Sequence, residues 1–326
     1  MNKILTIENL KVSFPTEDGL VKAVDSLNLD LHEGETVAIV GESGSGKTVT
    51  SLSIMGLHNP RATQISGSIR VKDGPETIDV VSGNPSKVRL LRGRVVSMIF
   101  QDPMSSLHPF YRIGDQLTEA YLVHNPGKKK EAKLRALELL DRVGIPDSKK
   151  RIDEYPHQFS GGMRQRVMIA MALILSPELL IADEPTTALD VTIQQQILAL
   201  VLEERRKRNM SMLWITHDLG VVANLVDKVV VMYAGRIVET GSVERIFKEP
   251  QHPYTAGLLA SLPKASDKNR TRLASIPGVP PKPWLVGESC AFAPRCSRVI
   301  EQCKVSKPEL VKANGTSSAC FNRVGA

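Results

Sequence analysis

The chain has 326 residues, of which 42% are hydrophobic and 24% charged, so a chain that is disordered throughout is excluded. The longest apolar stretch, residues 169–182, is interrupted by Ser176, Pro177 and Glu178, which leaves it too short for a membrane-spanning helix. The first residues lead directly into a strand-like run and lack the apolar core of a signal peptide. We therefore expect the chain to fold in the cytosol.

The net charge of +7 raises nucleic acid or an anionic membrane face as a partner. The basic residues form three short clusters without interleaved aromatic residues, at 128–130, 149–151 and 205–208. Clusters of this kind usually lie on solvated helix faces. We therefore expect no nucleic-acid partner.

Residues 4–14 and 21–31 alternate apolar and polar positions, which predicts two strands with one buried face each. The polar residues Glu17, Asp18 and Gly19 between them predict a turn.

Residues 41–48 read Gly-Glu-Ser-Gly-Ser-Gly-Lys-Thr, between a strand-like run at 36–40 and a helix-like run at 49–55. This spacing in this context is typical of a phosphate-binding loop rather than of an ordinary glycine-rich turn. The glycines let backbone N–H groups converge on an anion at the positive end of the helix, with Lys47 on the β- and γ-phosphates and the Thr48 hydroxyl on Mg²⁺. The expected nucleotide-binding positions are Gly41, Ser43, Gly44, Ser45, Gly46, Lys47 and Thr48. Phe14 precedes the loop, and its ring either stacks on an adenine or packs within the small sheet.

A polar stretch at 59–85 with short strand segments such as 68–71 comes next, and residues 95–100 then read as a buried strand that ends at Gln101. From 102 to about 175 the periodicity is helical, which predicts a helical insert. Within it, residues 132–143 carry one broad apolar stripe at Leu134, Leu137, Leu139, Leu140 and Val143. Gly144 and Pro146 are typical of the end of that helix.

Residues 159–163 read Phe-Ser-Gly-Gly-Met and precede a helix-like run at 164–175. A Ser-Gly-Gly turn that opens a helix is a second candidate anion site, although taken alone many such turns are only turns. The expected binding residues are Ser160, Gly161 and Gly162.

An apolar strand at 179–182 delivers Asp183 and Glu184 at its carboxyl end. Adjacent carboxylates at a strand end suit two tasks, holding Mg²⁺ and polarising an attacking water. A solvated turn with Pro185 is the other interpretation, and the phosphate-binding loop favours the functional one.

A further strand at 212–216 delivers His217, at the sheet edge where ligands bind in parallel α/β proteins. A single histidine is more often structural, and the two preceding nucleotide motifs favour a role in the site. Residues 229–233 and 236–240, joined by a turn at Gly235, predict a hairpin that closes the domain.

The ordered motifs resemble those of an ABC-type ATPase domain. They are the Walker A loop at 41–48, Gln101, the Ser-Gly-Gly signature, a Walker B strand at 179–183, Glu184, Asp190 and His217. Within that superfamily, the segment from His252-Pro253-Tyr254-Thr255 to Pro263 and the cysteine-bearing tail resemble the ATP-binding subunits of oligopeptide and dipeptide importers. Met163 stands where the general ABC signature most often has glutamine. A methionine at this position resembles the peptide-importer branch.

The resemblance implies roles for these residues. Two ATPase domains close head to tail, so that ATP is held by the loop of one and the Ser-Gly-Gly turn of the other. Glu184 is the base for water, His217 stabilises the γ-phosphate, and Gln101 senses it. Asp183 assists the metal, with Thr48 and Gln101 as the other Mg²⁺ contacts, and Asp190 belongs to the nucleotide-binding set.

The implied function is ATP hydrolysis in a membrane importer of dipeptides or oligopeptides. The implied partners are a second ATPase subunit, more often a paralogue than a second copy, two transmembrane permease subunits and, indirectly, an extracytoplasmic solute-binding protein. The chain would then be peripheral at the cytoplasmic face of the membrane. The alternative function is a soluble ABC ATPase that acts on nucleic acid or ribosomes. Such proteins carry long coiled coils or two ATPase domains in one chain, and this sequence has neither.

The chain has four cysteines, Cys290, Cys296, Cys303 and Cys320, all within its last 37 residues. Disulfides are disfavoured in a reducing cytosol, and the gaps of five, six and sixteen residues match structural zinc poorly. A four-thiolate iron–sulfur cluster tolerates such gaps, and the resemblance to peptide-importer tails implies a [4Fe–4S] cluster. Zinc and free packed thiols are the alternatives.

We therefore expect an α/β fold, a P-loop ABC ATPase with a parallel core sheet, an antiparallel β subdomain and a helical subdomain, plus a small Cys-rich C-terminal extension. The expected domains are an ATPase domain at 1–250, with the helical subdomain at about 102–175, and the extension at 251–326. The extension contains a Pro-rich connector at 276–283 that reads as stiff.

Overall fold

The computed structural model describes residues 2–185, 191–262, 275–282, 284, 286–313 and 315–325. The chain folds into two compact units, each built from separate stretches of the sequence. Unit 1 consists of Met1–Ile4, Leu31–Glu35 and Val71–Leu213, and unit 2 consists of Leu5–Asp30, Thr36–Arg70 and Trp214–Ala326.

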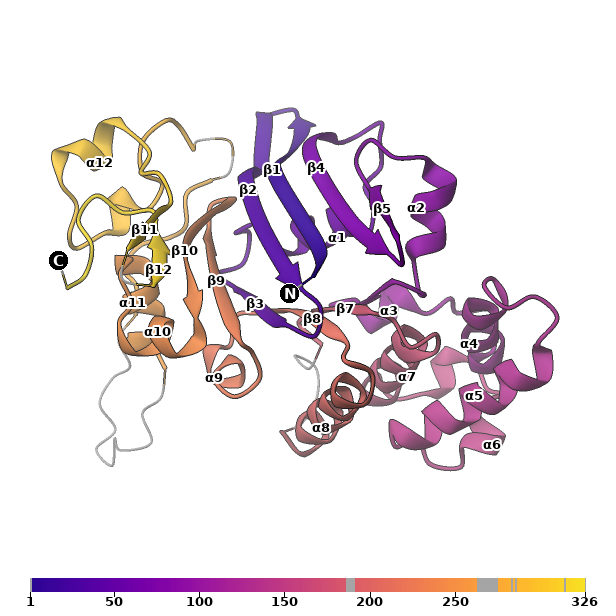
Figure 1. The fold of residues 1–326 in the computed structure, drawn as a ribbon. Helices are drawn as coiled ribbons and strands as arrows, with labels where there is room; N and C mark the ends of the chain where they lie inside the picture. The colour runs from indigo at the N-terminus through magenta and orange to yellow at the C-terminus, as the bar shows by residue number, and fades with distance from the viewer. Residues whose placement is uncertain are drawn as a thin grey trace. The chain divides into compact units, whose positions relative to one another are not determined.

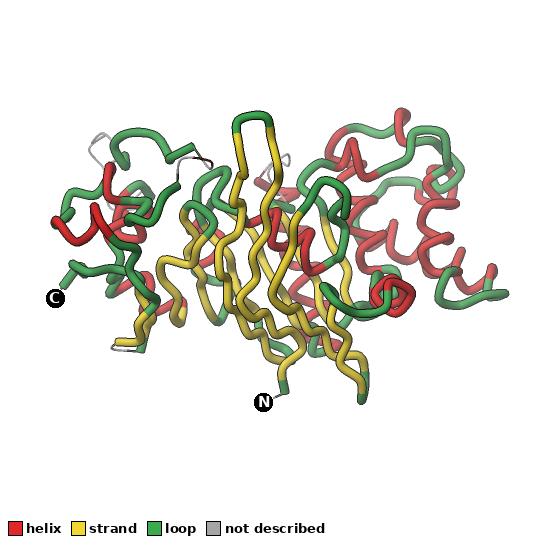
Figure 2. Tube along the Cα trace, turned by 90° about the horizontal axis from the view of Figure 1, so that it is seen from above, coloured by secondary structure: helices red, strands yellow, loops and turns green. Residues whose placement is uncertain are grey.

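The first sheet in unit 2 is built mainly from three strands, in the order β2, β1, β4. Their bounds are Lys3–Thr16 for β1, Gly19–His32 for β2 and Gln64–Asp73 for β4. β1 and β2 form the long hairpin visible in Figure 2, with buried positions alternating along β2 at Leu27, Leu29 and Leu31. The two predicted strands and their turn are therefore confirmed, and the predicted 68–71 segment is the centre of the longer strand β4.

The second sheet in unit 2 is mixed, with the order β11, β12, β10, β9, β3. The strands are β3 Thr36–Val40, β9 Lys228–Tyr233, β10 Arg236–Ser242, β11 Val311–Ala313 and β12 Thr316–Ser318. β3 pairs parallel with β9, and the remaining neighbours are antiparallel. Every residue of β3 is buried, as a strand covered on both faces requires.

The predicted hairpin of β9 and β10 is not the edge of the sheet. The hairpin exists, but β10 continues the sheet by pairing with β12, with Glu239 opposite Ser318 and Thr240 opposite Ser317. Figure 1 shows β12 beside β10 and β11 beyond it. The reason is that an edge strand with free N–H and C=O groups is completed by another strand, here one supplied from the end of the chain.

Short helices accompany this sheet: α1 Lys47–Ile54, α9 Leu219–Val222, α10 Val243–Lys248, α11 Pro253–Ala260, the 3₁₀ turn Ala293–Arg295 and α12 Glu301–Val305. The start of α11 is tied to β10 by Glu239, a fully buried carboxylate. Its two oxygens accept the backbone N–H groups of Gln251 and His252 at 2.7 and 2.9 Å. Such paired acceptors satisfy donors that the first turn of a helix leaves free.

Unit 1 contains the parallel strand pair β6 Val96–Ile99 and β7 Leu179–Asp183, with Ile99 opposite Ala182. Both predicted buried strands are confirmed. β5 Glu76–Asp79 also lies in this unit, and β8 Ser211–Thr216 begins in unit 1 and ends in unit 2.

Helices are the main secondary structure of unit 1. Its helices are α2 Pro85–Leu91, α3 Pro103–Ser106, α4 Ile113–Leu122, α5 Lys129–Arg142, α6 Ser148–Arg151, the 3₁₀ turn Pro156–Gln158, α7 Gly161–Leu173 and α8 Val191–Arg208. The predicted helical insert thus consists of α3 to α7. Within the described residues, no helix is long and apolar enough to cross a membrane.

The broad apolar stripe predicted for residues 132–143 is wrong in one respect. Leu134 is 69% exposed, whereas Leu139, Leu140 and the alanines Ala132 and Ala136 are fully buried. Residues four, seven and eight after Ala132 share its face at about 100° per residue, and a residue two positions on points the opposite way. The small alanines were therefore the better markers of the packed face of α5.

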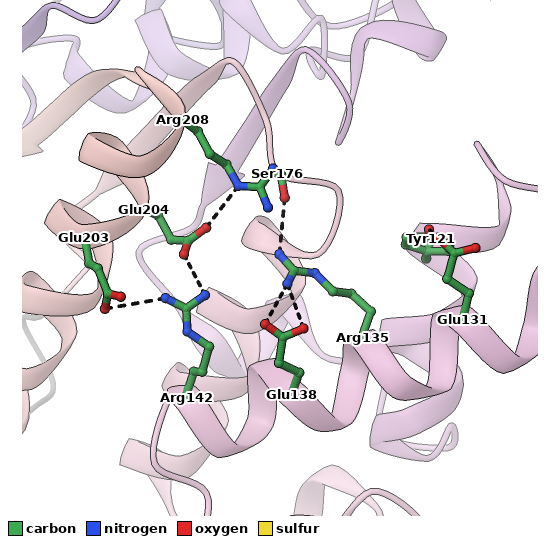
Figure 3. Close-up of polar contacts among 9 residues, drawn as sticks. All are labelled: Tyr121, Glu131, Arg135, Glu138, Arg142, Ser176, Glu203, Glu204 and Arg208. Atoms are coloured by element: carbon green, nitrogen blue, oxygen red, sulfur yellow. Dashed lines mark hydrogen bonds and ion pairs between the residues drawn. The ribbon is translucent and has the colours of Figure 1, made fainter.

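The basic clusters lie on helices of unit 1 and are partly paired with carboxylates. Lys207 contacts Glu203 at 2.5 Å, and Arg208 contacts the buried Glu204 at 3.4 Å (Figure 3). Arg151 contacts Glu154 at 3.0 Å. These pairs agree with the expectation of solvated helix faces.

Candidate functional site

The predicted phosphate-binding loop lies in unit 2 between β3 and α1, as a nucleotide loop requires. Gly46 is left-handed, with φ 99°, and caps the first turn of α1. A Cβ at Gly46 would overlap the carbonyl oxygen of Ala23, so glycine is required there by both conformation and space. The backbone thus curves tightly into the positive end of the helix, where an anion is favoured.

Lys47 is almost fully buried in this loop. Its Nζ donates to the carbonyl oxygens of Gly41 and Glu42, at 2.8 and 2.9 Å. The ammonium group is therefore held directly at the mouth of the loop. It has the reach and charge to contact a nucleotide's terminal phosphates.

Glu42 is contacted by residues far along the chain. Tyr254 Oη accepts its backbone N–H at 2.8 Å, and Arg295 forms two ion-pair contacts with its carboxylate, at 2.7 and 3.0 Å. The sequence analysis assigned no role to Glu42, Tyr254 or Arg295. Only the position of Arg295 between two of the cysteines, and of Tyr254 in the His-Pro-Tyr-Thr segment, drew attention to their surroundings.

The predicted carboxylate pair lies in unit 1, at the end of β7. Asp183 is buried, and Glu184 follows it with a positive φ of 46°. Gln101, which follows β6, donates from Nε2 to Glu184 Oε2 at 3.1 Å. The parallel pairing of β6 and β7 thus brings together Gln101 and Glu184, two of the predicted residues. A left-handed glutamate is an unusual conformation of the kind found at functional sites.

The Ser-Gly-Gly signature begins α7, also in unit 1. Ser160 is its N-cap, and its Oγ accepts the backbone N–H of Met163 at 3.3 Å. Further along α7, Gln165 donates from Nε2 to the carbonyl oxygen of Pro185, the residue after Glu184. The signature helix is therefore hydrogen-bonded to the residue that follows the carboxylate pair.

Two other predicted residues lie in unit 2. His217 is exposed directly after β8, as expected for a strand-end residue. Phe14 lies in β1 and meets the His58 ring edge-on, with centroids 5.8 Å apart. Whether Phe14 also stacks on adenine stays a prediction, and Asp190 lies outside the described residues.

The four cysteines lie in unit 2 as free thiols. Burial raises the pKa of Cys290, Cys296 and Cys320, the last to about 11, and neighbouring cysteines contribute to each of these rises. The backbone N–H of Cys290 donates to the carbonyl oxygen of Cys303 at 2.9 Å, so these two cysteines lie side by side. In the part of the chain that the structure describes, however, no group of three or more His, Cys, Asp or Glu side chains is arranged to hold a metal ion.

Known proteins resemble the chain along nearly its whole length. Residues 24–187 match the ABC transporter family, and residues 238–303 match the family described as oligopeptide/dipeptide transporter, C-terminal region. The dipeptide transport ATP-binding protein DppD of Bacillus subtilis (strain 168) is 50% identical over 323 residues, which cover 98% of this chain and 95% of that protein. A peptide import ATP-binding protein of Brucella abortus (strain 2308) is 50% identical over 319 residues, with coverage of 95% and 94%.

Solved structures agree with this match. A dimeric bacterial ABC transporter cassette has a TM-score of 0.65 at 25% identity, covering 73% of this chain and 98% of that one. A part of the cbiONQ ABC transporter complex of Clostridium perfringens has a TM-score of 0.60 at 28% identity, with coverage of 76% and 92%. The fold, the phosphate-binding loop and the motifs define an ABC-type ATPase. More particularly, the chain belongs to the ATP-binding subunits of the oligopeptide/dipeptide importer family, which hydrolyse ATP for peptide import.

Proposed function

We propose that the described motifs divide the work of ATP hydrolysis as follows. Lys47 and the loop amides bind the phosphates, Phe14 stacks on the adenine, and His217 contacts the γ-phosphate. Thr48, Gln101 and Asp183 supply the oxygen ligands that Mg²⁺ prefers, and the ion neutralises phosphate charge when bound. Asp190, six positions after Glu184, is the last of the proposed nucleotide-binding residues.

Glu184 acts as the general base. It takes a proton from the water that attacks the γ-phosphorus, while the bond from that phosphorus to the β–γ bridging oxygen breaks and ADP leaves. The observation that carries this assignment is the hydrogen bond from Gln101 at 3.1 Å, because it orients the Glu184 carboxylate at the end of a buried strand. An oriented carboxylate within reach of water is what a general base needs.

The test is the variant Glu184→Gln, which keeps the shape and removes the base. We expect it to bind ATP with the affinity of the unmodified chain and to lose at least about a hundredfold in turnover. Glu138→Gln, an exposed glutamate of α5, is the matched control and should leave both values unchanged. Turnover of Glu184→Gln at the unmodified rate would remove Glu184 from the role of base.

The chain works with a second ATPase subunit, with Ser160, Gly161 and Gly162 of each serving the ATP bound by the other. Family membership and the Ser160 cap of α7, which leaves the signature at a helix start, support this arrangement. Two permease subunits and an extracytoplasmic solute-binding protein complete the importer at the cytoplasmic face of the membrane. DppD of Bacillus subtilis is named for dipeptide transport, so dipeptides are the first solutes to test.

The partners are tested by affinity purification of the tagged chain from detergent-solubilised membranes. Recovery of two hydrophobic permease subunits and a paralogous ATPase is the expected result. Recovery of ribosomes or DNA without permeases would favour a soluble ABC ATPase. Uptake of labelled dipeptides, with and without the chain in the cell, then tests the solute.

The C-terminal residues, from about 251 onward, form an extension whose four cysteines ligate a [4Fe–4S] cluster. Thiolates are the donors such clusters take, and the backbone N–H of Cys290 donates to the carbonyl oxygen of Cys303 at 2.9 Å, which places these two cysteines side by side. Anaerobic purification followed by iron, sulfide and zinc assays is the test. About four irons per chain would support the cluster, whereas zinc alone or neither metal would reject it.

A further inference from the structure

The C-terminal residues of unit 2 hold the phosphate-binding loop at Glu42. The backbone N–H of Glu42 donates to Tyr254 Oη at 2.8 Å, and its carbonyl oxygen accepts from Lys47 Nζ at 2.9 Å. Its carboxylate receives both terminal nitrogens of Arg295, at 2.7 and 3.0 Å. Every polar group of this one loop residue is therefore engaged, two of them by residues more than 200 positions along the chain.

Arg295 is built into its position. Its side chain is 6% exposed, and besides Glu42 it donates to the carbonyl oxygen of Pro277 at 2.9 Å and to Tyr233 Oη at 3.2 Å. The Glu42 carboxylate raises the pKa of Arg295, so the guanidinium is permanently charged. A planar guanidinium matches a carboxylate with two parallel hydrogen bonds, a geometry that lysine cannot reproduce.

The contact lies beside open space. A cavity of about 130 Å³ is lined by Glu42, Ser43, Gly44 and Ser45 of the loop and by Pro280, Pro281 and Val286 of the segment that leads to the cysteines. The C-terminal segment thus faces the loop as well as contacting it. An ATP molecule bound by the loop would approach a residue, Glu42, whose own charge is negative.

We propose that Arg295 is a positioning residue of the ATP site, whose charge neutralises Glu42 so that the loop accepts a triphosphate. The proposal rests on the assignment of residues 41–48 as the ATP loop. Without Arg295, an uncompensated carboxylate on the loop would repel the phosphates. The C-terminal segment is then part of the nucleotide site, although no motif marks it as such.

The proposal predicts that the two partners behave differently. Arg295→Gln leaves a bare carboxylate and should weaken ATP binding about tenfold, mainly as a rise in KM with kcat nearly unchanged. Glu42→Gln removes the negative charge and should change the affinity for ATP by less than about twofold. Its thermal midpoint should fall, because Arg295 is then a buried cation without its carboxylate partner. The double variant Glu42→Gln/Arg295→Gln should recover most of the lost affinity.

The measurement is titration of the full chain with ATP, followed by steady-state ATPase assays and thermal unfolding. Lys307→Gln is the matched control, because Lys307 also joins the C-terminal region to an earlier part of unit 2, the strand β2, through Asp25 at 3.4 Å, and among the described residues has no ion pair with the loop. It should bind ATP normally. Lys47→Ala should abolish binding in every background.

The outcomes separate the proposal from its premise. If the unmodified chain did not bind ATP, or if Lys47→Ala bound it as well as the unmodified chain, the assignment of residues 41–48 as the ATP loop would be rejected. Equal weakening by Arg295→Gln and Glu42→Gln with no recovery in the double variant would make the pair a purely structural contact and overturn the proposal. If Arg295→Gln does not fold, the affinities of the double variant and of Arg295→Lys for ATP test the proposal instead. Near-normal affinity in both supports charge neutralisation, and a tenfold loss in the double variant rejects it.

Discussion

His252 is a buried histidine at the start of α11. Its side chain is 2% exposed, its Nδ1 accepts the backbone N–H of Tyr254 at 3.0 Å, and its own backbone N–H donates to Glu239. Burial lowers the pKa of His252 to about 4. The histidine is thus an N-cap that functions in its neutral form, because a protonated Nδ1 could not accept a hydrogen bond.

This neutral histidine makes stability fall in mild acid. In the unfolded chain, His252 takes up a proton as the pH drops below 6.5, whereas in the folded chain it does so only near pH 4. Stability is therefore fully present above pH 6.5 and is lost progressively down to pH 4, by up to about 3 kcal/mol. His252→Asn keeps a capping oxygen and removes the titration, so it should show a smaller drop in thermal midpoint between pH 7 and pH 5.

Comparison at each pH cancels the titration of neighbouring groups. Glu239 is the one in direct contact, and burial raises its pKa, so acid affects it in the opposite direction in both proteins. Equal pH dependence of the unmodified chain and His252→Asn would show that His252 contributes nothing to acid sensitivity.

At the scale of elements, α5 and α8 are joined by a buried ion pair in unit 1. Glu204 of α8 is 3% exposed and contacts Arg142, the last residue of α5, at 2.6 Å (Figure 3). Arg208 reaches the same carboxylate at 3.4 Å from a half-exposed position, and Glu203 contacts Arg142 at 3.5 Å. Figure 3 also shows Arg135 of α5 between Glu138 and Ser176, a second link from the same helix.

Removal of Arg142 should be much more damaging than removal of Arg208. Arg142→Gln leaves a buried carboxylate without its closest cation and should cost about 3 kcal/mol of unfolding free energy. Arg208→Gln removes an exposed contact and should cost less than about 1 kcal/mol. Urea unfolding of the full chain gives both values. A loss of the same size in the two variants would mean that burial of Glu204 does not control the energetics.

Local pattern was sufficient for most of these elements. Apolar runs such as 36–40 and 179–182 predict buried strands, because a strand covered on both faces needs continuous apolar residues. The spacing of glycine, lysine and hydroxyl residues between a strand-like and a helix-like run marked the phosphate-binding loop, since these residues must stand at fixed positions around a phosphate. The prediction that Leu134 belongs to the packed face was wrong, because single hydrophobic residues also occur on exposed surfaces.

Contacts between distant segments could not be predicted in this way. Arg295 and Glu42 are 253 positions apart, and the sequence around either residue does not indicate that the two form a pair. The pairing of β12 with β10 was missed for the same reason, since three residues with two serines carry no strand period. The Gln101–Glu184 contact was within reach, because both follow strands that the sequence predicts to be buried and parallel.

At the scale of the whole molecule, hydrogen bonds and a strand pairing join the C-terminal residues to the rest of unit 2. β12 completes β10, the N–H groups of Gln251 and His252 satisfy Glu239, and Tyr254 and Arg295 hold Glu42. The division at residue 250 follows the motifs of the sequence, whereas the hydrogen bonds of the folded chain cross it repeatedly. The C-terminal residues therefore contribute to both the sheet and the phosphate-binding loop.

A chain that ends at residue 250 should consequently be poorly soluble. It would expose the edge of β10 and leave Glu239 buried without its two N–H donors, and both defects favour aggregation or unfolding. Ser317→Pro in the full chain isolates the first defect, because β12 is a central strand and proline removes a ladder donor there. Ser317→Ala is the control and should behave like the unmodified chain. Soluble expression and the thermal midpoint are the measurements. A truncated chain that is soluble and unfolds at the unmodified temperature would show that residues 1–250 fold alone and that the C-terminal contacts add nothing to their stability.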